Sequence, residues 1–500
     1  MDSTGTTGLA ARYGHGAAYD AARQRTVIYG GFFYPNGPMY GDTREWDGSA
    51  WTVAFSDSPS RRYGHRLAYD AARDKTVLFG GYDYAGNWFA DTWTWDGARW
   101  AHPAVSGPPA RYMHHQVYDA ARDVVVLFGG GTSTMLDDTW EWNGAAWAQR
   151  AGSGPPARGA GGMAYDSGRQ VSVLFGGWSG AAHLADTWEW NGTAWTQRAG
   201  AGPPPRRHTA LAYDAHRART VLFGGIGDGE THFGDTWEWD GGNWVEQLVA
   251  GPGARFAMAL YYDAPRQVVV LMGGATTNQY LADEWEWNGE AWTRRDIATT
   301  PHGRCYHATA YDTVRQTGVL CAGYFNDGSN RLLSDTWALH NTSTSYVRQG
   351  LPARQTALAR EPKTLSVSVQ ATGTPHYQWR KDGTPLAENP PRVTGTQTAT
   401  LALDPVEYGD DGYYDVLITD DCGTMGSAAG RLVVPPPGDL NCDGDVTFDD
   451  INPFVLALSN PAGYQQQFPD CRLLQGDCNG DGLVNFDDIN PFVALLSGAP

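Results

Sequence analysis

The chain has 500 residues and a formal net charge of −19, with 63 Gly, 21 Trp and only 36 Lys and Arg. This length exceeds one ordinary domain, and so many large aromatic side chains exclude a disordered protein. The negative charge argues against binding to nucleic acid or to anionic membrane surfaces. No apolar run of about 18 residues occurs, so we expect no membrane-spanning helix.

The cysteines and the first residues bear on the compartment. None of the six cysteines lies in the first 300 residues, which excludes a small disulfide-rich scaffold. Residues 1–10 are polar and rich in Gly and Thr, with no apolar signal core. An extracellular or cell-surface location must therefore be argued from the modules that follow.

A repeat fills the first two thirds of the chain, with spacings of 47 to 50 residues. Each copy has an opening Arg, a Tyr-Asp, an apolar run, an Asp-Thr-Trp-like segment and a later Trp. In the second copy the β-rich segments are 65–69, 76–79, 91–95 and 99–102. The apolar run ends on a Gly-Gly pair that begins at Gly30, Gly80, Gly129, Gly176, Gly224 and Gly273, with a degenerate copy at Ala322-Gly323.

Asp-Gly or Asn-Gly, as at Asp47-Gly48, stands between the third and fourth segments of the repeat. This dipeptide is typical of a two-residue hairpin in which both residues have positive φ. Four antiparallel strands per repeat predict the blade of a β-propeller. Such a sheet must stack on its neighbours, and 20 of the 21 Trp, all before residue 340, can fill the space between blades.

The Gly-Gly pair followed by a spaced Trp resembles the kelch repeat over residues 11–346. The resemblance implies a seven-bladed β-propeller, commonly a binding platform, in a family that includes the galactose oxidase type of copper radical oxidase. Polar residues that recur from copy to copy, such as Asp20 with Arg23, and His15, are interpreted as scaffold residues, with the Asp and Arg forming a local ion pair.

Function is expected where the repeats differ, mainly in the connections after the second and fourth strands. These connections carry exposed aromatic residues suited to stacking on sugars or anchoring a protein. The alternative is that the aromatics only fill the loop cores. We favour Tyr84, Trp88 and Trp178 as ligand contacts, because their loops are long enough to reach the central opening.

Residues 351–434 resemble an immunoglobulin-like β-sandwich. Trp379 has the position of the buried core Trp, and Asp410-Asp-Gly-Tyr-Tyr414 precedes a late strand as in a tyrosine corner. Val416 stands where the second Cys of the family is expected, so the inter-sheet disulfide is absent, and Cys422 has no assigned partner.

Residues 439–498 contain two acidic loops 38 residues apart, each followed by an expected short helix. A calcium loop needs oxygen ligands at positions 1, 3, 5, 9 and 12, a carbonyl at 7 and Gly at 6. Both loops match, so we expect two calcium ions. The ligands would be Asp439, Asn441, Asp443, Asp445 (carbonyl), Thr447 and Asp450, and then Asp477, Asn479, Asp481, Leu483 (carbonyl), Asn485 and Asp488.

The duplicated loop-plus-helix unit resembles a bacterial dockerin, a family whose members dock onto cohesin and often accompany polysaccharide-degrading modules. The residues here that match the usual cohesin contacts are Phe448, Asp449, Val455, Leu456, Phe486, Asp487, Val493 and Ala494. Those that lie in the expected helices are apolar where many dockerins are polar or basic.

The dockerin resemblance also implies an oxidising environment, which would fit a disulfide between Cys305 and Cys321, on the first and second strands of the last repeat. The alternative is two buried thiols. Cys471 is expected to pair with Cys442 or with Cys478, and the sequence does not choose between them.

The main functional hypothesis is a secreted binding protein whose propeller recognises a glycan or an extracellular protein and whose calcium module attaches it to a partner such as cohesin. One alternative is a carbohydrate-active enzyme, although no catalytic set of residues stands out. The other is a surface adhesion or structural component.

Overall fold

The computed structural model describes residues 2–4, 9–33, 37–54, 58–150, 153–198, 200–295, 301–325, 331–339, 345–357, 359–443, 445–469 and 471–497. The chain divides into two compact units. The first, here called the ring unit, comprises Met1–Gln247, Pro252–Gly289 and Arg294–Ser343, and the second comprises Leu248–Gly251, Glu290–Thr293 and Thr344–Pro500.

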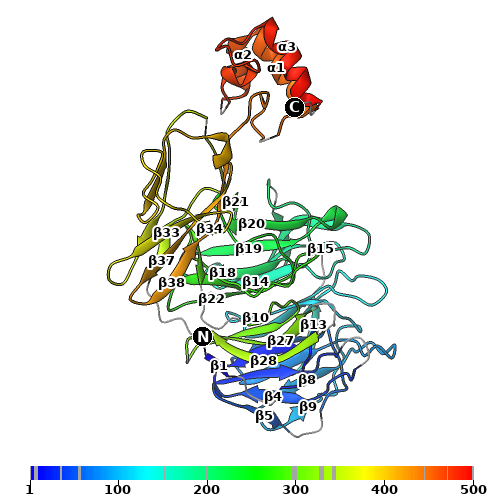
Figure 1. Ribbon diagram of the computed structural model, residues 1–500. Helices are drawn as coiled ribbons and strands as arrows, with labels where there is room; N and C mark the ends of the chain where they lie inside the picture. Colours follow the sequence, from blue (N-terminus) through cyan, green and yellow to red (C-terminus); the bar gives the residue numbers. More distant parts are fainter. Residues whose placement is uncertain are drawn as a thin grey trace. The chain divides into compact units, whose positions relative to one another are not determined.

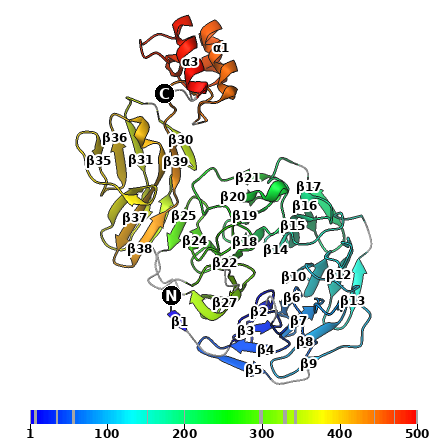
Figure 2. The same ribbon diagram turned by 45° about the vertical axis from the view of Figure 1, so that its right-hand side comes forward.

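Strands β1 to β28 fall into seven groups of four, arranged about a common centre (Figures 1 and 2); six groups are separate four-stranded sheets and the other, β22–β25, is part of a larger sheet. The first strand of each group contacts the first strands of the two neighbouring groups, and the last of them contacts β2. These strands are β2 (Gly16–Asp20), β6 (Arg66–Asp70), β10 (His115–Asp119), β14 (Gly162–Asp166), β18 (Ala210–Asp214), β22 (Ala259–Asp263) and β26 (Ala308–Asp312).

The second strands form the core of the unit, because their apolar side chains are buried on both faces. They are β3 (Arg25–Tyr29), β7 (Lys75–Phe79), β11 (Val124–Phe128), β15 (Val171–Trp178), β19 (Arg219–Ile226), β23 (Val268–Met272) and β27 (Thr317–Phe325). The third strands are β4 (Thr43–Trp46), β8 (Thr92–Trp95), β12 (Thr139–Trp142), β16 (His183–Trp190), β20 (His232–Trp239), β24 (Glu284–Trp287) and β28 (Arg331–Leu339). The connection between β19 and β20 contains the short 3-10 helix η1 (Asp228–Glu230).

The fourth strands complete the groups. They are β5 (Trp51–Ala54), β9 (Trp100–Ala101), β13 (Trp147–Arg150), β17 (Trp195–Arg198), β21 (Trp244–Glu246) and β25 (Trp292–Arg295). In the seventh group the fourth strand is β1 (Asp2–Thr4), which pairs antiparallel with β28. The N-terminal segment therefore completes the sheet formed by the last repeat, a pairing that the sequence did not indicate.

A cycle of backbone hydrogen bonds closes the ring unit. In each group, a single residue that precedes the first strand donates its backbone N–H to the carbonyl of the equivalent residue in the preceding group. The bonds run from Gly64 to Gly14 (3.0 Å), Met113 to Gly64 (3.2 Å), Ala160 to Met113 (3.1 Å), His208 to Ala160 (2.7 Å), Ala257 to His208 (3.2 Å), Tyr306 to Ala257 (3.3 Å) and Gly14 to Tyr306 (3.3 Å). All seven residues have φ between 50° and 69°.

The opening arginine of each repeat is a buried scaffold residue, as predicted. Arg62, for example, donates to the Gly80 carbonyl at 2.9 Å and forms a two-pronged ion pair with Asp91. Equivalent pairs join Arg12–Asp42, Arg111–Asp138, Arg158–Asp186, Arg206–Asp235, Arg255–Asp283 and Arg304–Asp335. The predicted ion pair three residues apart, such as Asp20–Arg23 at 2.7 Å, also forms in all seven repeats.

Tryptophans join neighbouring groups, which confirms that they fill the space between sheets. The Trp95 indole N–H donates to Glu45 and that of Trp100 to Thr43, each at 2.6 Å. The same Trp-to-Thr bond joins the first group to the seventh, from Trp51 to Thr336, at 2.6 Å.

The hairpin prediction is correct in position and wrong in geometry. Only Gly48 of the Asp47-Gly48 pair has positive φ, at 98°. Asp47 instead accepts hydrogen bonds from the amides of Ser49 and Ala50, each at 2.8 Å, because a short carboxylate caps a tight turn.

The immunoglobulin-like part of the second unit has the predicted core. The Trp379 side chain is fully buried and pairs across the sheet with Val416, and the Tyr414 hydroxyl donates to the Asp410 carbonyl at 2.8 Å. The strands are β29 (Tyr346–Gln349), β30 (Arg354–Thr356), β31 (Lys363–Ser366), β32 (Ser368–Gln370), β33 (His376–Lys381), β34 (Thr384–Pro385), β35 (Val393–Thr394), β36 (Thr400–Leu403), β37 (Gly412–Asp420), β38 (Gly423–Ser427) and β39 (Gly430–Val433), with the 3-10 helix η2 (Tyr408–Asp410) before β37.

The C-terminal region is small and helical (Figure 1). Its helices are η3 (Phe448–Asp450), α1 (Ile451–Ser459), α2 (Pro461–Gln467), η4 (Leu473–Gly476), η5 (Phe486–Asp488) and α3 (Ile489–Leu496). α1 and α3 follow the acidic loops as predicted, whereas α2 was not expected. A disulfide joins Cys442 to Cys471, which selects one of the two pairings left open by the sequence, and Cys422 and Cys478 are free.

The predicted Cys305–Cys321 disulfide does not form, because both thiols are free and buried. The strand register explains this correction. Cys321 lies opposite Ala308, whereas Cys305 lies opposite Tyr324, so the two side chains do not face each other. The alternative of two buried thiols describes the structure.

Candidate binding site

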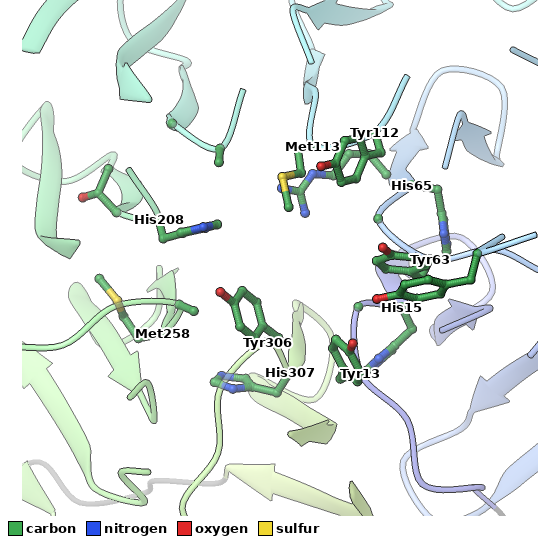
Figure 3. A pocket seen from close by; sticks show the side chains of 18 residues that line it. Tyr13, His15, Tyr63, His65, Tyr112, Met113, His208, Met258, Tyr306 and His307 are labelled. Atoms are coloured by element: carbon green, nitrogen blue, oxygen red, sulfur yellow. The ribbon is translucent and has the colours of Figure 1, made fainter. Parts of the chain in front are cut away.

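A cavity of about 450 Å³ opens at the centre of the ring unit. Its wall is built from the segments that carry the hydrogen-bonded cycle, together with the loop after β7. Figure 3 shows aromatic and imidazole side chains from different groups around the opening. Five of the lining residues are tyrosines, namely Tyr13, Tyr63, Tyr84, Tyr112 and Tyr306.

The tyrosines support one another around the rim, here called the tyrosine belt. Tyr84 stacks on Tyr63 with ring centres 4.7 Å apart, and Tyr306 packs edge-on against His208 at 5.8 Å. Burial raises the pKa of Tyr306 to about 12 and also raises that of Tyr112. The phenols are therefore protonated at neutral pH and offer flat rings together with O–H donors.

Histidines line the same cavity in their neutral form. Burial, with a smaller contribution from nearby arginines, lowers the pKa of His15 and His307 to about 3 and that of His208 to about 4. A neutral imidazole carries one N–H donor and one acceptor nitrogen. The lining thus combines uncharged hydrogen-bonding groups and exposed aromatic faces with one cation, Arg66.

The three favoured ligand residues lie at different distances from this site. Tyr84 lines the cavity and its side chain is half exposed. Trp88 stacks on Tyr82 at 4.2 Å and contacts Tyr112, so it lies directly behind the belt. Trp178 is not part of the lining and packs on His183 at 4.8 Å. Tyr34, another aromatic of the variable loops, lies outside the described residues.

Sequence reasoning missed most of the tyrosine belt, because it treated the segment after the opening Arg as scaffold. Tyr13 and Tyr306 belong to that segment. The signal was present in the repeat itself. The residue that takes part in the hydrogen-bonded cycle differs between repeats, as Gly14, His208 and Tyr306 show, whereas its backbone conformation stays the same. Variation at a fixed backbone position marks a site rather than a scaffold.

The two acidic loops form a second candidate site, in the second unit. The final carboxylates, Asp450 and Asp488, are fully buried. Asp450 accepts hydrogen bonds from the amides of Leu440, Asn441 and Thr447 at 2.8 to 3.0 Å. These bonds bring the second, third and ninth positions of the loop together around one carboxylate.

The second loop repeats this arrangement. Asp488 accepts from the amides of Cys478, Asn479 and Asn485 at 2.8 to 3.1 Å. Asp477 accepts from the amide of Gly482, whose φ is 89°. In the described part of the chain, no three His, Cys, Asp or Glu side chains are grouped as a metal centre. The oxygen donors predicted for these loops also include Asn, Thr and carbonyl groups, which such a grouping does not cover.

Apolar side chains next to the acidic loops are exposed in matching pairs. Phe448 and Phe486 are 76% and 79% exposed, and Val455 and Val493 are 54% and 55% exposed. Leu456 instead packs against the core of the region. Each loop-plus-helix therefore presents the same apolar surface, as a duplicated unit should.

Comparison with known proteins identifies one segment. Residues 348–430 match the immunoglobulin I-set domain. No curated protein matches the chain.

Similar solved structures are single or paired immunoglobulin domains. Titin domain M4 is 20% identical, with 18% of this chain and 94% of that chain covered and a TM-score of 0.17. The Ig1-2 module of the Drosophila receptor protein tyrosine phosphatase DLAR is 18% identical, with 24% and 61% covered and a TM-score of 0.18. Dpr1 IG1 bound to DIP-eta IG1 is 19% identical, with 18% and 96% covered and a TM-score of 0.15.

These findings correct the family assignment. The assignment of the repeat to the kelch family, with its oxidase branch, and of the C-terminal region to the dockerin family is wrong, since the matching family is the immunoglobulin I-set. The physical reason is that the signals were local. Gly pairs, Asp-Gly turns and Asx-rich loops occur in any chain that forms tight turns. They therefore predict local structure better than they predict the family to which a chain belongs.

None of the helices in the described residues has the length and apolar character needed to cross a membrane. The chain is thus predominantly β-structured, with an immunoglobulin-like domain and a small helical C-terminal region that contains a disulfide.

Proposed function

We propose that the protein is an extracellular adhesion or structural component that binds a glycan or protein ligand at the tyrosine belt of the ring unit. One observation carries this proposal. Five tyrosines and neutral histidines from different repeats converge on a single central cavity. Rigid aromatic groups with a polar tip are the residues that binding surfaces favour.

The architecture of the ring unit supports a binding role. The ring unit contains seven groups of four strands, joined by a closed cycle of hydrogen bonds. Such a scaffold holds loops from different repeats in fixed positions around one opening. The ligand is then recognised without ordering the loops, which lowers the entropic cost of binding.

The I-set match at residues 348–430 supports the adhesion and structural reading. Immunoglobulin-like domains of this kind are common in cell-surface proteins, and the Cys442–Cys471 disulfide fits an oxidising environment. The paired apolar surface of Phe448 and Phe486 is suited to a protein partner. An extracellular location with a protein partner is therefore part of the proposal.

We propose further that the acidic loops bind two calcium ions. Each loop supplies the complete series of oxygen donors, and its last carboxylate is buried and holds the loop closed. Bound calcium would neutralise part of the local negative charge and fix the loops against α1 and α3.

The proposed function is tested with the full chain on an array of glycans and extracellular-matrix proteins. Tyr63→Ala and Tyr306→Ala should each remove most of the binding that the unaltered chain shows. Tyr118→Ala is the matched control, because Tyr118 lies outside the cavity and donates to Asp123 at a turn. Equal binding by all variants, or no binding to the array by the unaltered chain, would contradict a binding site at the belt.

A further inference from the structure

Arg66 is the charged residue of the central channel. It lines both the cavity at the tyrosine belt and a second chamber of about 340 Å³. The two chambers share six lining residues, His15, Arg66, Gly161, Thr209, Met258 and His307. Arg66 therefore lies where a ligand that passes the belt would arrive.

The Arg66 guanidinium is only partly used by the protein. Its Nε donates to the His114 carbonyl at 3.1 Å, and no described residue accepts a hydrogen bond from its other two nitrogens. The scaffold arginines differ, since each, like Arg62, pairs with a carboxylate and also donates to backbone carbonyls. Arg66 thus has donors left for a ligand in the fork geometry that matches a carboxylate.

No negative charge compensates Arg66 within the channel. Of the described residues that line the two chambers, none is Asp or Glu. The chain as a whole carries a net charge of −19, so an acid-free cavity with a cation stands out from its surroundings. Desolvation by the surrounding channel lowers the pKa of the guanidinium, which a bound anion would oppose.

The repeats also differ at this position. Strand register aligns Arg66 with Gly16, His115, Gly162, Ala210, Ala259 and Ala308. Five of these six residues have no side chain or a single methyl group, which leaves space at the centre of the channel. Only one of the seven equivalent positions therefore carries a long cationic side chain, and the scaffold does not require it there.

We propose that the channel binds the carboxylate of an acidic sugar, a hexuronic acid residue, with the sugar ring on the tyrosine belt and the carboxylate on Arg66. This inference rests on the proposed function and narrows its ligand class. Flat rings above and a fork of N–H donors below match a pyranose ring with a carboxylate on one edge. The neutral imidazole of His208 can donate to the same group or to a hydroxyl.

The test uses the full chain and titration calorimetry with trimers of galacturonic, glucuronic and mannuronic acid. Each acidic trimer is paired with its neutral hexose counterpart of the same linkage, and an acetylated tripeptide ending in Glu is included. At least one uronic acid trimer should bind, its neutral counterpart about 10- to 100-fold more weakly, and the binding should weaken with added salt.

Arg66→Ala should lower the affinity for the acidic trimer by about 10- to 100-fold and leave binding of the neutral trimer unchanged. The variant should fold, because three of the other repeats carry Ala at the aligned position. Arg66→Lys should lose part of the affinity, since Lys keeps the charge without the fork. Arg99→Ala is the control, because Arg99 is 80% exposed at a distant turn.

Three results would overturn the inference. The first is that the Arg66→Ala variant binds the acidic and neutral trimers as well as the unaltered chain does. The second is that the chain binds the Glu peptide in preference to every uronic acid. The third is that it binds none of the probes. In the first two cases Tyr306→Ala still reports on the proposed function, which survives if that variant reduces binding. If neither the probes nor the array find a ligand, both proposals fail.

Discussion

The amide of Gly14 donates to the carbonyl of Tyr306 at 3.3 Å, so the first repeat is joined directly to the last. This bond is one of seven equivalent bonds, and each requires its donor residue to adopt a left-handed backbone conformation. Glycine adopts that conformation without strain, whereas other residues do so at a cost. The ring unit therefore stores backbone strain at the positions that line its cavity.

Ala257→Gly should stabilise the ring unit by about 0.5–1 kcal/mol. Ala257 has a φ of 52°, and removal of its methyl group relieves left-handed strain that outweighs the greater freedom of glycine in the unfolded chain. Urea denaturation measures the change. Ala259→Gly, in the extended strand β22, is the control and should destabilise. A similar loss for both variants would show that Ala257 is not strained.

Arg158→Ala should destabilise the unit by about 3–5 kcal/mol, because Asp186 would be left without its partner beside a buried site. Thermal and urea unfolding measure the loss. The double variant Arg158→Ala/Asp186→Ala should recover part of it, since no uncompensated charge remains. If the double variant is no more stable than the single one, the loss is due to packing.

The unit should lose stability as pH falls from about 6.5. The pKa values of His15, His115 and His307 in the folded chain are lowered to about 3 by burial, and that of an unfolded histidine is about 6.5. Between these values the unfolded chain binds more protons, so the free energy of unfolding rises with pH, by at most about 1.4 kcal/mol per pH unit for each histidine.

One acid opposes this trend. Burial raises the pKa of Glu284 to about 7, so its contribution to stability falls as pH rises through that range. Several histidines against one glutamate leave a net gain from pH 5 to pH 7.5, which urea midpoints at the two pH values would measure. His307→Gln should reduce the slope. A midpoint that does not change with pH would refute the buried neutral histidines.

Alkylation of the denatured, unreduced chain should label Cys305, Cys321, Cys422 and Cys478 and spare Cys442 and Cys471. In the native chain Cys422 should react first, because it is exposed. Burial raises the pKa of Cys305 and Cys321 to about 12, which keeps their thiols protonated. Mass spectrometry after tryptic digestion distinguishes the sites. A Cys305–Cys321 peptide linked without added oxidant would contradict the structure.

Titration of the chelator-treated full chain with calcium should give two ions per chain. Asp439→Ala and Asp477→Ala should each reduce the count to one, because each removes the first ligand of one loop. Asp487→Ala is the matched control, since Asp487 is an exposed neighbour outside the ligand series. Unchanged stoichiometry in both ligand variants, or no heat of binding, would refute the calcium sites.

Local features of the fold could be read from the sequence. The period of the Gly-Gly pairs predicted seven repeats, and the strands of the second copy lie within one or two residues of β6 to β9. The Asp20–Arg23 ion pair was predictable because both residues belong to one turn. Trp379 and Tyr414 identified the immunoglobulin-like core, because their environments are specific to that sandwich.

Other features depended on contacts between distant segments. Strand β1 has the sequence Asp-Ser-Thr, which carries no apolar alternation, because it joins the sheet through its backbone. Tyr306 and Tyr13 meet only when the cycle closes, so neither repeat alone reveals the belt. Cys305 and Cys321 were expected to face each other across the last hairpin, but the regular register that pairs Ala308 with Cys321 places Tyr324, not Cys321, opposite Cys305.

The pairing of β1 with β28 also sets an order of events during synthesis. β1 leaves the ribosome before every other strand of the ring unit, and its partner β28 leaves after all the others. Six of the seven sheets can form on the nascent chain while β1 waits without a partner. The seventh sheet can thus form only after the whole unit has been synthesised. A chain interrupted before β28 would leave its N-terminal segment unpaired and open to proteases.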